Sequence, residues 1–291
     1  MQPFGIQTDE APSATRASGP VAIGGGHLRT LDDIADFRAC VALQEATWGR
    51  DGETVHASLL TVAAHIGGLV VGAFDAHNAL VGFVFGLPGA DADGPLHWSH
   101  MLAVLGEVRG AGIGRLLKEY QRAELARRGV TRIFWTFDPL QARNAHLNVT
   151  RLGARIVSYV DNLYGVTASP LHLGIATDRV IAMTDAASQP LPHHDLGIRE
   201  HEPVRSVGSV GSVGSVGARG VAPSALELGA PAVLVEIPAD IQDIVNTDTA
   251  LAGQWRLATR AHFHSLLDSG YAVTGFVRDE TAQRAFYRFT R

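Results

Sequence analysis

Three glycines at alternate positions, Gly110, Gly112 and Gly114, stand between an apolar stretch and a helical pattern. Backbone N–H groups at the start of a helix carry a partial positive charge, and glycines let a phosphate approach them closely. A Walker-type loop would need Lys and then Ser or Thr after the last glycine, but an arginine and a leucine follow here. A dinucleotide fingerprint is poorly matched, because Leu117 takes the place of its last glycine. A phosphate-binding turn of another class and a tight turn without ligand both stay open.

Histidines are the second set of residues that could do chemistry. His97 and His100 lie on a predicted strand just before the glycines. Imidazole has an unperturbed pKa of about 6.5, which suits proton removal near neutral pH. A packed or solvent-facing histidine is the alternative. The pair His193 and His194 has no acidic or histidine partner at ligand spacing, so we expect no metal site.

The elements that position these residues follow from hydrophobic periodicity and turn residues. Helices are predicted over 31–49, 55–66, 113–129 and 140–153, a hairpin over 69–87, and strands over 96–105, 132–138 and 154–160. Asp32 or Asp33 would cap the first helix, and Gly49 would end it. The strands 96–105 and 132–138 flank one crossover helix, which predicts a parallel pair in an otherwise antiparallel sheet.

The rest of the chain is organised differently. Strands are predicted over 178–183 and 232–238, a helix over 249–270, and a closing hairpin after residue 270. The repeat "SVGSVGSVGSVG" at 206–217 is typical of a flexible surface insertion. Residues 1–26 are rich in Pro, Ser, Thr and Gly, which is typical of a flexible leader.

The loop resembles that of the GNAT superfamily of N-acyltransferases, whose pattern is R/Q-x-x-G-x-G/A between a strand and a helix. Arg109, Gly112 and Gly114 match it. The run at 135–154, the "DR" at 178–179 and "EIP…WRLATR" within 236–260 resemble predicted GNAT acyltransferases with a long C-terminal extension. The resemblance implies a mixed α/β fold with a mostly antiparallel central sheet, one splayed parallel strand pair and a C-terminal α/β extension. Its parts would be a leader over 1–26, an acyl-CoA-binding domain over 27–165, and an extension over 166–291 with a flexible insertion at about 201–222.

The same resemblance implies where acyl-CoA binds. Backbone groups of the first strand in the splayed pair would bind the pantetheine arm and polarise the thioester carbonyl. Amides of the glycine loop would bind the pyrophosphate, and two asparagines in the helix 140–153 would contact the arm or the acceptor. The implied cofactor-binding residues are Leu102, Ala103, Val104, Arg109, Gly110, Ala111, Gly112, Ile113, Gly114, Arg115, Asn144 and Asn148.

The implied chemistry is attack by an amine on the thioester. His100 lies three residues before Ala103, where arylalkylamine acetyltransferases of the superfamily carry a histidine implicated in proton removal, so we favour it as base. The usual tyrosine position holds Val149; Tyr164, Tyr159 or solvent would then protonate the thiolate. Trp48, Arg179 and Arg256 are candidate substrate-binding residues, the arginines for a carboxylate. Surface ion pairs are the alternative for the arginines, and Asp138 is a candidate helix cap.

Composition limits the partners. The 291-residue chain has a formal net charge of −5, so no broad basic field would attract nucleic acid or an anionic membrane. The lone cysteine, Cys40, is expected to be a buried hydrophobe in a reducing compartment. No membrane-length apolar run or secretion signal is present, so we expect a cytoplasmic protein. The extension could also pack against a second copy, as in a homodimer.

The function predicted is acylation of a small-molecule amine by acyl-CoA, with acetyl-CoA the favoured donor and no metal. One alternative is a succinyl-CoA-dependent enzyme acting on an amino acid. The other is a GNAT-like module that binds CoA without turnover, which the absent tyrosine favours and the strand histidines oppose.

Overall fold

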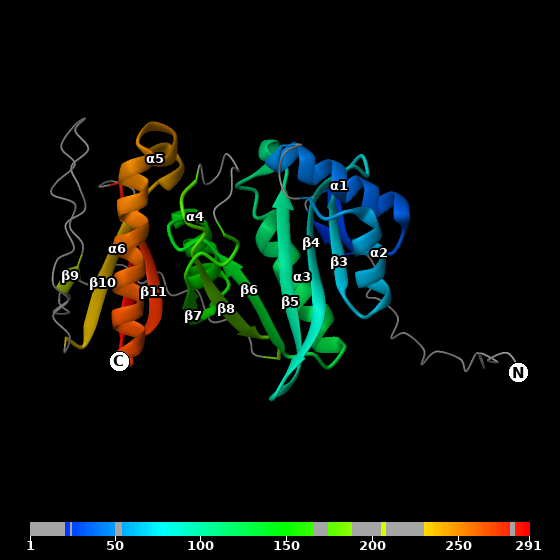
Figure 1. Cartoon of the computed structure of the whole chain (residues 1–291). Coiled ribbons are helices and arrows are strands. Elements are labelled where there is room, and N and C mark those ends of the chain that lie inside the picture. Colours follow the sequence, from blue (N-terminus) through cyan, green and yellow to red (C-terminus); the bar gives the residue numbers. More distant parts are fainter. Residues whose placement is uncertain are drawn as a thin grey trace, which may run out of the picture. The chain divides into compact units, whose positions relative to one another are not determined.

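The computed structural model describes residues 21–23, 25–49, 54–165, 174–187, 205–207, 230–279 and 283–291 (Figure 1). The chain divides into two compact units, residues 1–131 and 132–291. Most of the predicted leader, most of the predicted insertion and the pair His193–His194 lie outside the described residues. The strands of the predicted parallel pair belong to different units, and their pairing stays a prediction.

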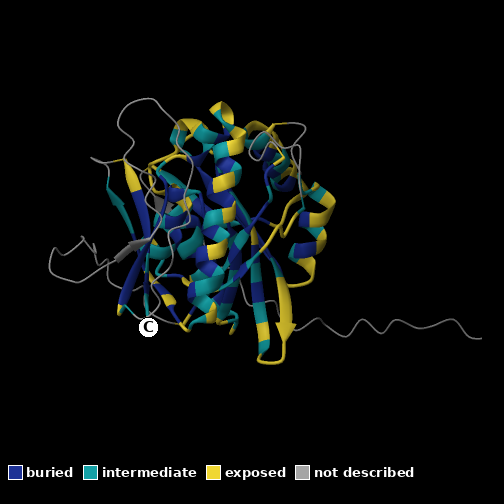
Figure 2. Ribbon diagram, turned by 60° about the vertical axis from the view of Figure 1, so that its left-hand side comes forward, coloured by how far each residue is buried: buried dark blue, intermediate teal, exposed yellow. Residues whose placement is uncertain are grey.

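The first unit is built on five strands that pair antiparallel in chain order. They are β1 (Val21–Ile23), β2 (Gly26–Thr30), β3 (Leu69–Phe74), β4 (Leu80–Asp91) and β5 (Gly94–Val104). The helices are α1 (Ile34–Trp48), α2 (Ala57–His65), the 3₁₀ turn η1 (Gly106–Val108) and α3 (Ile113–Arg127). β3 is buried along its whole length, whereas the far end of the β4–β5 hairpin is exposed (Figure 2).

Local sequence signals account for most of these boundaries. Asp33 caps α1 by accepting a 2.6 Å hydrogen bond from the Ala35 amide, and Gly49 ends the helix at φ +84°. In the β3–β4 turn, the Asp75 carboxylate accepts from the amides of His77 and Ala79. The predictions of the capped first helix and of the hairpin are therefore confirmed.

The core of the first unit lies where α1 and α2 meet the sheet. Phe37, Leu60, Phe83 and Phe85 are among its buried members. Cys40 also lies in this core, as expected, and burial raises the pKa of its thiol to about 12. A Cβ built on Gly82 would meet the side chains of Ile113 and Leu117 at 3.3 Å, which places α3 close against β4.

The second unit holds two sheets. In one, β8 (Arg179–Asp185) pairs antiparallel with β6 (Arg132–Phe137) and with β7 (Arg155–Val160). In the other, the order is β11 (Ala272–Asp279), β12 (Arg284–Thr290), β10 (Ala232–Pro238), β9 (Arg205–Val207). Its helices are α4 (Ala142–Ala145), the π-helical segment η2 (His146–Arg151), α5 (Ile241–Thr247) and α6 (Thr249–Asp268).

The predicted class, a mixed α/β fold with a mostly antiparallel sheet and an extension with its own sheet, is confirmed. One expectation was wrong in part: the helix over 140–153 is α-helical only from Ala142 and then widens into a π-helix, with Leu152 N–H bonded to Leu147 O. Residues 205–207, placed in the flexible insertion, form β9, which runs parallel to β10. The strands β1, which lies within the predicted leader, and β2 were not predicted, and neither was the short helix α5.

Candidate active site

The glycine loop leaves β5 through η1 and enters α3 as an exposed surface turn. Gly110 and Gly112 have φ values of +89° and +82°, and a Cβ built on either would meet nothing within 4 Å. Glycine is therefore needed for the left-handed backbone and not for lack of space. The open surroundings leave room for a ligand to approach the main chain.

The first turn of α3 supplies the donors. Leu116 N–H makes the first i→i−4 hydrogen bond of the helix, 3.1 Å to Gly112 O. The amides of Ile113, Gly114 and Arg115 come before it and so have no acceptor within the helix. Arg109 closes the loop by donating from Nε to Val104 O at 3.1 Å. The Arg115 side chain pairs with Glu119 at 3.0 Å in an exposed i,i+4 contact. The arrangement can bind an anion such as a diphosphate through main-chain hydrogens.

A β-bulge in β5 lies at His100. Phe85 pairs with Met101 and Gly86 with Ser99, so His100 is the extra residue on β5. Its side chain is exposed, and its ring meets Phe85 edge-on at 5.9 Å. Trp48 packs, half-buried, against the same core as Phe85. The structure therefore brings His100 and Trp48 to the core that α1 and α2 cover.

His97 has a different environment. It is 1 % exposed, and a Cβ on Gly86 would lie 2.1 Å from its Nε2, so its ring occupies the space that a side chain at Gly86 would need. Gln121 Nε2 lies 3.2 Å from that nitrogen. Because an amide nitrogen only donates, His97 Nε2 accepts and the ring is neutral. Burial, with the nearby positive charges of Lys118 and Arg128, lowers the pKa of His97 to about 4.

A hydrogen-bond network between α3 and β5 was not recognised from the sequence. Lys118 Nζ donates to Ser99 Oγ at 2.8 Å, and Ser99 Oγ donates to Gln121 Oε1 at 2.8 Å. Burial lowers the pKa of Lys118 to about 7. The available signal was Gln121, a polar residue one turn after Leu117 on the buried stripe of α3.

Leu102, Ala103 and Val104, the predicted contacts of the pantetheine arm, continue β5 beyond the bulge. Their partners on β4 are Val84, Phe83 and Gly82. The side chains of Leu102 and Val104 lie toward α3, 3.5 and 4.0 Å from a Cβ built on Gly114, while Ala103 is buried in the core under α1 and α2.

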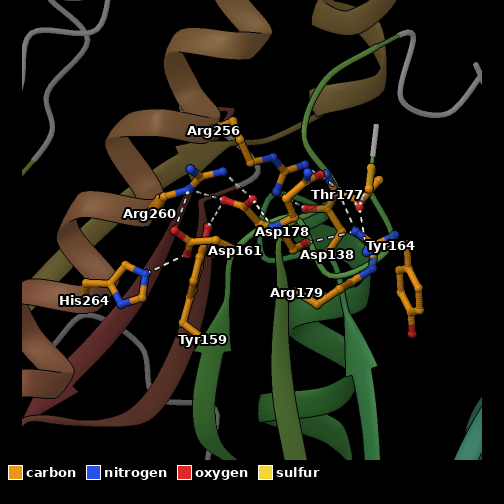
Figure 3. Close-up of polar contacts among 12 residues, drawn as sticks. Asp138, Tyr159, Asp161, Tyr164, Thr177, Asp178, Arg179, Arg256, Arg260 and His264 are labelled. Carbon is orange, nitrogen blue, oxygen red and sulfur yellow. Dashed lines mark hydrogen bonds and ion pairs between the residues drawn. The ribbon is translucent and has the colours of Figure 1, made fainter. Parts of the chain in front are cut away.

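In the second unit, ion pairs join α6 to the ends of β6 and β8 (Figure 3). Arg256 binds both carboxylate oxygens of Asp138, each at 2.7 Å, and Arg260 binds Asp178 at 2.6 and 2.9 Å. Tyr159 OH also donates to Asp178 at 2.8 Å. Burial alone would raise the pKa of Asp138, but the Arg256 guanidinium, with help from Arg179, holds it below its usual value.

These contacts show the surroundings of the two arginines that were predicted to bind substrate, Arg179 and Arg256. Arg256 is 3 % exposed and held by Asp138, so its predicted role with substrate stays a prediction that must compete with this pair. Arg179 lies 5.3 Å over the Tyr164 ring, and Tyr164 OH is 3.1 Å from Thr136 Oγ1 on β6. Tyr164 is 43 % exposed. The structure thus brings Tyr164 and Arg179 together.

The two asparagines differ. Asn148 is buried; its Oδ1 accepts from Trp135 Nε1 at 2.9 Å and its Nδ2 donates to Asn144 O at 2.8 Å. Both ends of this amide therefore have partners within the protein. Asn144 is exposed on the same helix, one turn earlier. Asp138 accepts from Leu140 N–H at 2.8 Å, so it caps the turn that precedes the helix, while Gln141 is the residue next to α4.

Two absences concern only the described part of the chain. There, no cluster of three or more His, Cys, Asp or Glu side chains could hold a metal ion. Among the helices described, none has the length and apolar character needed to cross a membrane.

Comparison with known proteins gives one family match. Residues 37–153 match the model of the acetyltransferase (GNAT) family. No curated protein matches the sequence. Solved structures with a similar arrangement include the ribosomal-protein-S18-alanine N-acetyltransferase of Escherichia coli, at 18 % identity, 57 % of this chain, 97 % of that chain and TM-score 0.44. Another is a phosphinothricin acetyltransferase of Sinorhizobium meliloti. It is 16 % identical over 58 % of this chain and 94 % of that chain, with a TM-score of 0.46.

These structural likenesses are weak, whereas the family match runs from within α1 to just beyond the 142–151 helix and includes the glycine loop, His100 and both asparagines. Residues 37–153 are therefore the part of the chain that is similar to the GNAT family of acetyltransferases.

Proposed function

We propose that this chain transfers an acetyl group from acetyl-CoA to the amine of a small molecule, by direct attack of the amine on the thioester. The observation that carries the proposal is the geometry of the glycine loop within the matched family domain. Gly110 and Gly112 take left-handed conformations in open space, next to the first amides of α3. That arrangement suits the diphosphate of coenzyme A.

The chain's own residues have distinct roles in this reaction. Amides between Arg109 and Arg115 hold the diphosphate, and backbone groups of Leu102 to Val104 bind the pantetheine arm and donate to the thioester oxygen as negative charge develops there. Asn144, exposed on its helix, also contacts the arm. Trp48 contributes an apolar wall to the acceptor site.

Proton transfer completes the balance. The amine nitrogen attacks the carbonyl carbon, the C–S bond breaks, and the thiolate of coenzyme A leaves. His100 accepts the proton that the amine loses; its exposed position at the bulge makes it reachable, unlike the buried His97. Tyr164, exposed beside Arg179, or solvent returns a proton to the thiolate.

The test is a thiol-release assay in which acetyl-CoA and succinyl-CoA are each offered to amino acids of both hands and to simple arylalkylamines. We expect acetyl-CoA with an amine to release thiol. Release only from succinyl-CoA with an amino acid would replace the donor and acceptor proposed here by the alternative pair.

A matched pair of variants separates enzyme from binding module. His100→Ala should lower turnover by roughly 10²- to 10⁴-fold while calorimetry still detects coenzyme A binding. His77→Ala removes another exposed histidine, in the β3–β4 turn, and should change neither. Unchanged turnover in His100→Ala would remove that residue as base, and binding without any turnover in the wild type would support the module. Absence of coenzyme A binding by the wild type would refute the proposed function as a whole.

A further inference from the structure

We propose that the C-terminal extension positions the 142–151 helix (α4 with η2) for acyl-CoA, and that Tyr287 and Arg256 are its positioning residues. This rests on the proposed function, in which Asn144 of that helix contacts the pantetheine arm. The extension would then be a working part of the acyl-CoA site and not an appendage.

Two extension residues hold the turn before the helix. Arg256 of α6 binds both oxygens of Asp138 at 2.7 Å, and Tyr287 of β12 donates its hydroxyl to Pro139 O at 2.8 Å. Both contacts are buried. Asp138 in turn accepts from Leu140 N–H, so the carboxylate that Arg256 holds also shapes the turn.

A third contact holds the other end of the helix. Thr150 Oγ1 donates to Phe276 O of β11 at 3.0 Å. Phe263 of α6 packs against Tyr287 at 5.0 Å and Tyr159 at 5.2 Å between ring centroids, so α6 and the second sheet share one aromatic core with β7. Three elements of the extension, α6, β12 and β11, therefore reach both ends of the 142–151 helix.

The helix needs such support because its own geometry is weak. Its α-helical part spans only Ala142–Ala145, and the rest is π-helical. Helices this short have little stability of their own, and π-helical turns are rare and often occur at functional sites. The external contacts therefore decide the direction in which the exposed Asn144 side chain is presented.

The test compares two tyrosines of the extension. Tyr287→Phe removes only the hydroxyl that holds Pro139 O and leaves the ring against Phe263 and Phe276. Tyr271→Phe removes the hydroxyl of another buried tyrosine, which donates to Ala230 O at 2.7 Å in a partly buried hydrogen bond and not to the turn before the 142–151 helix. We expect the Kd of acetyl-CoA, measured by calorimetry, to rise about two- to tenfold in Tyr287→Phe and to stay unchanged in Tyr271→Phe.

The melting temperature of each variant is measured alongside, since each tyrosine variant loses one hydrogen bond within the protein. Thr150→Val, which removes the contact at the far end of the helix, should weaken acetyl-CoA in the same direction as Tyr287→Phe. If both tyrosine variants bind like the wild type, or both weaken equally with their melting temperatures, the inference is overturned while the proposed function stands. If the wild type itself does not bind acetyl-CoA, the proposed function fails and the inference fails with it.

Discussion

The Arg256–Asp138 pair gives a stability prediction whose size follows from burial. Arg256→Met keeps much of the apolar stem but leaves Asp138, 7 % exposed, without its bidentate partner. Removing one member of a buried pair typically costs about 3–5 kcal/mol. Arg179, whose Nη1 lies 3.8 Å from Asp138, still offsets part of the charge, so we expect a loss near about 3 kcal/mol. Since whole domains are stable by only about 5–15 kcal/mol, the effect is large.

The assay is urea unfolding of four proteins: wild type, Arg256→Met, Asp138→Asn and the double variant. Asparagine keeps an oxygen that can accept from Leu140 N–H while removing the charge. The double variant leaves no unbalanced charge from this pair, so it should lie within about 1–2 kcal/mol of wild type. Arg284→Met is the control; Arg284 pairs with Glu236 but is 43 % exposed, so its loss should be about 1 kcal/mol or less.

The pH dependence supplies a second check. The pKa of folded Asp138 is held below its ordinary value, so its stabilisation is present above the unfolded pKa of about 3.9 and is lost as pH falls through the lower folded value. Wild type should lose this part of its stability on acidification, and the double variant should not. If Arg256→Met costs no more than Arg284→Met, or if the two losses simply add in the double variant, the argument from burial is refuted.

Three other predictions concern the first unit. Gly112→Ala should cost about 1–2 kcal/mol because alanine is strained at φ +82°, and calorimetry should show weaker coenzyme A binding; unchanged binding would argue against the loop as the diphosphate site. Gly86→Ala should destabilise by about 1–3 kcal/mol, since its Cβ would lie 2.1 Å from His97 Nε2 and 2.6 Å from Trp98 O; a wild-type unfolding curve would contradict that packing. The folded pKa of Lys118, about 7, lies below its unfolded value of about 10.4, so wild-type stability should rise with pH across that window. The free energy of unfolding should rise by less than about 1.4 kcal/mol per pH unit, because the Lys118 side chain keeps some contact with solvent. Lys118→Met should abolish this rise. An identical pH profile in the variant would refute a lowered pKa.

Much of the fold could be predicted because its signals are local. Asp33 and Gly49 bound α1, Asp75 shapes the β3–β4 turn, and Gly112 starts α3, each through hydrogen bonds or dihedral angles within a few residues. The resemblance of the loop to the GNAT pattern could likewise be recognised from residues 109–114 alone. The π-helical widening after Ala145 has no such local signal in the sequence.

What only the tertiary structure decided concerns partners far apart in the chain. Two histidines on β5 were equivalent by type, but in the folded chain His97 is buried beside Gly86 and Gln121, whereas His100, the extra residue of the bulge, is exposed. Arg256 was a candidate for a substrate carboxylate, yet its carboxylate partner is Asp138, 118 positions away. The residue type alone tells that an arginine is positively charged. Which carboxylate lies next to it depends on how the strands and helices pack.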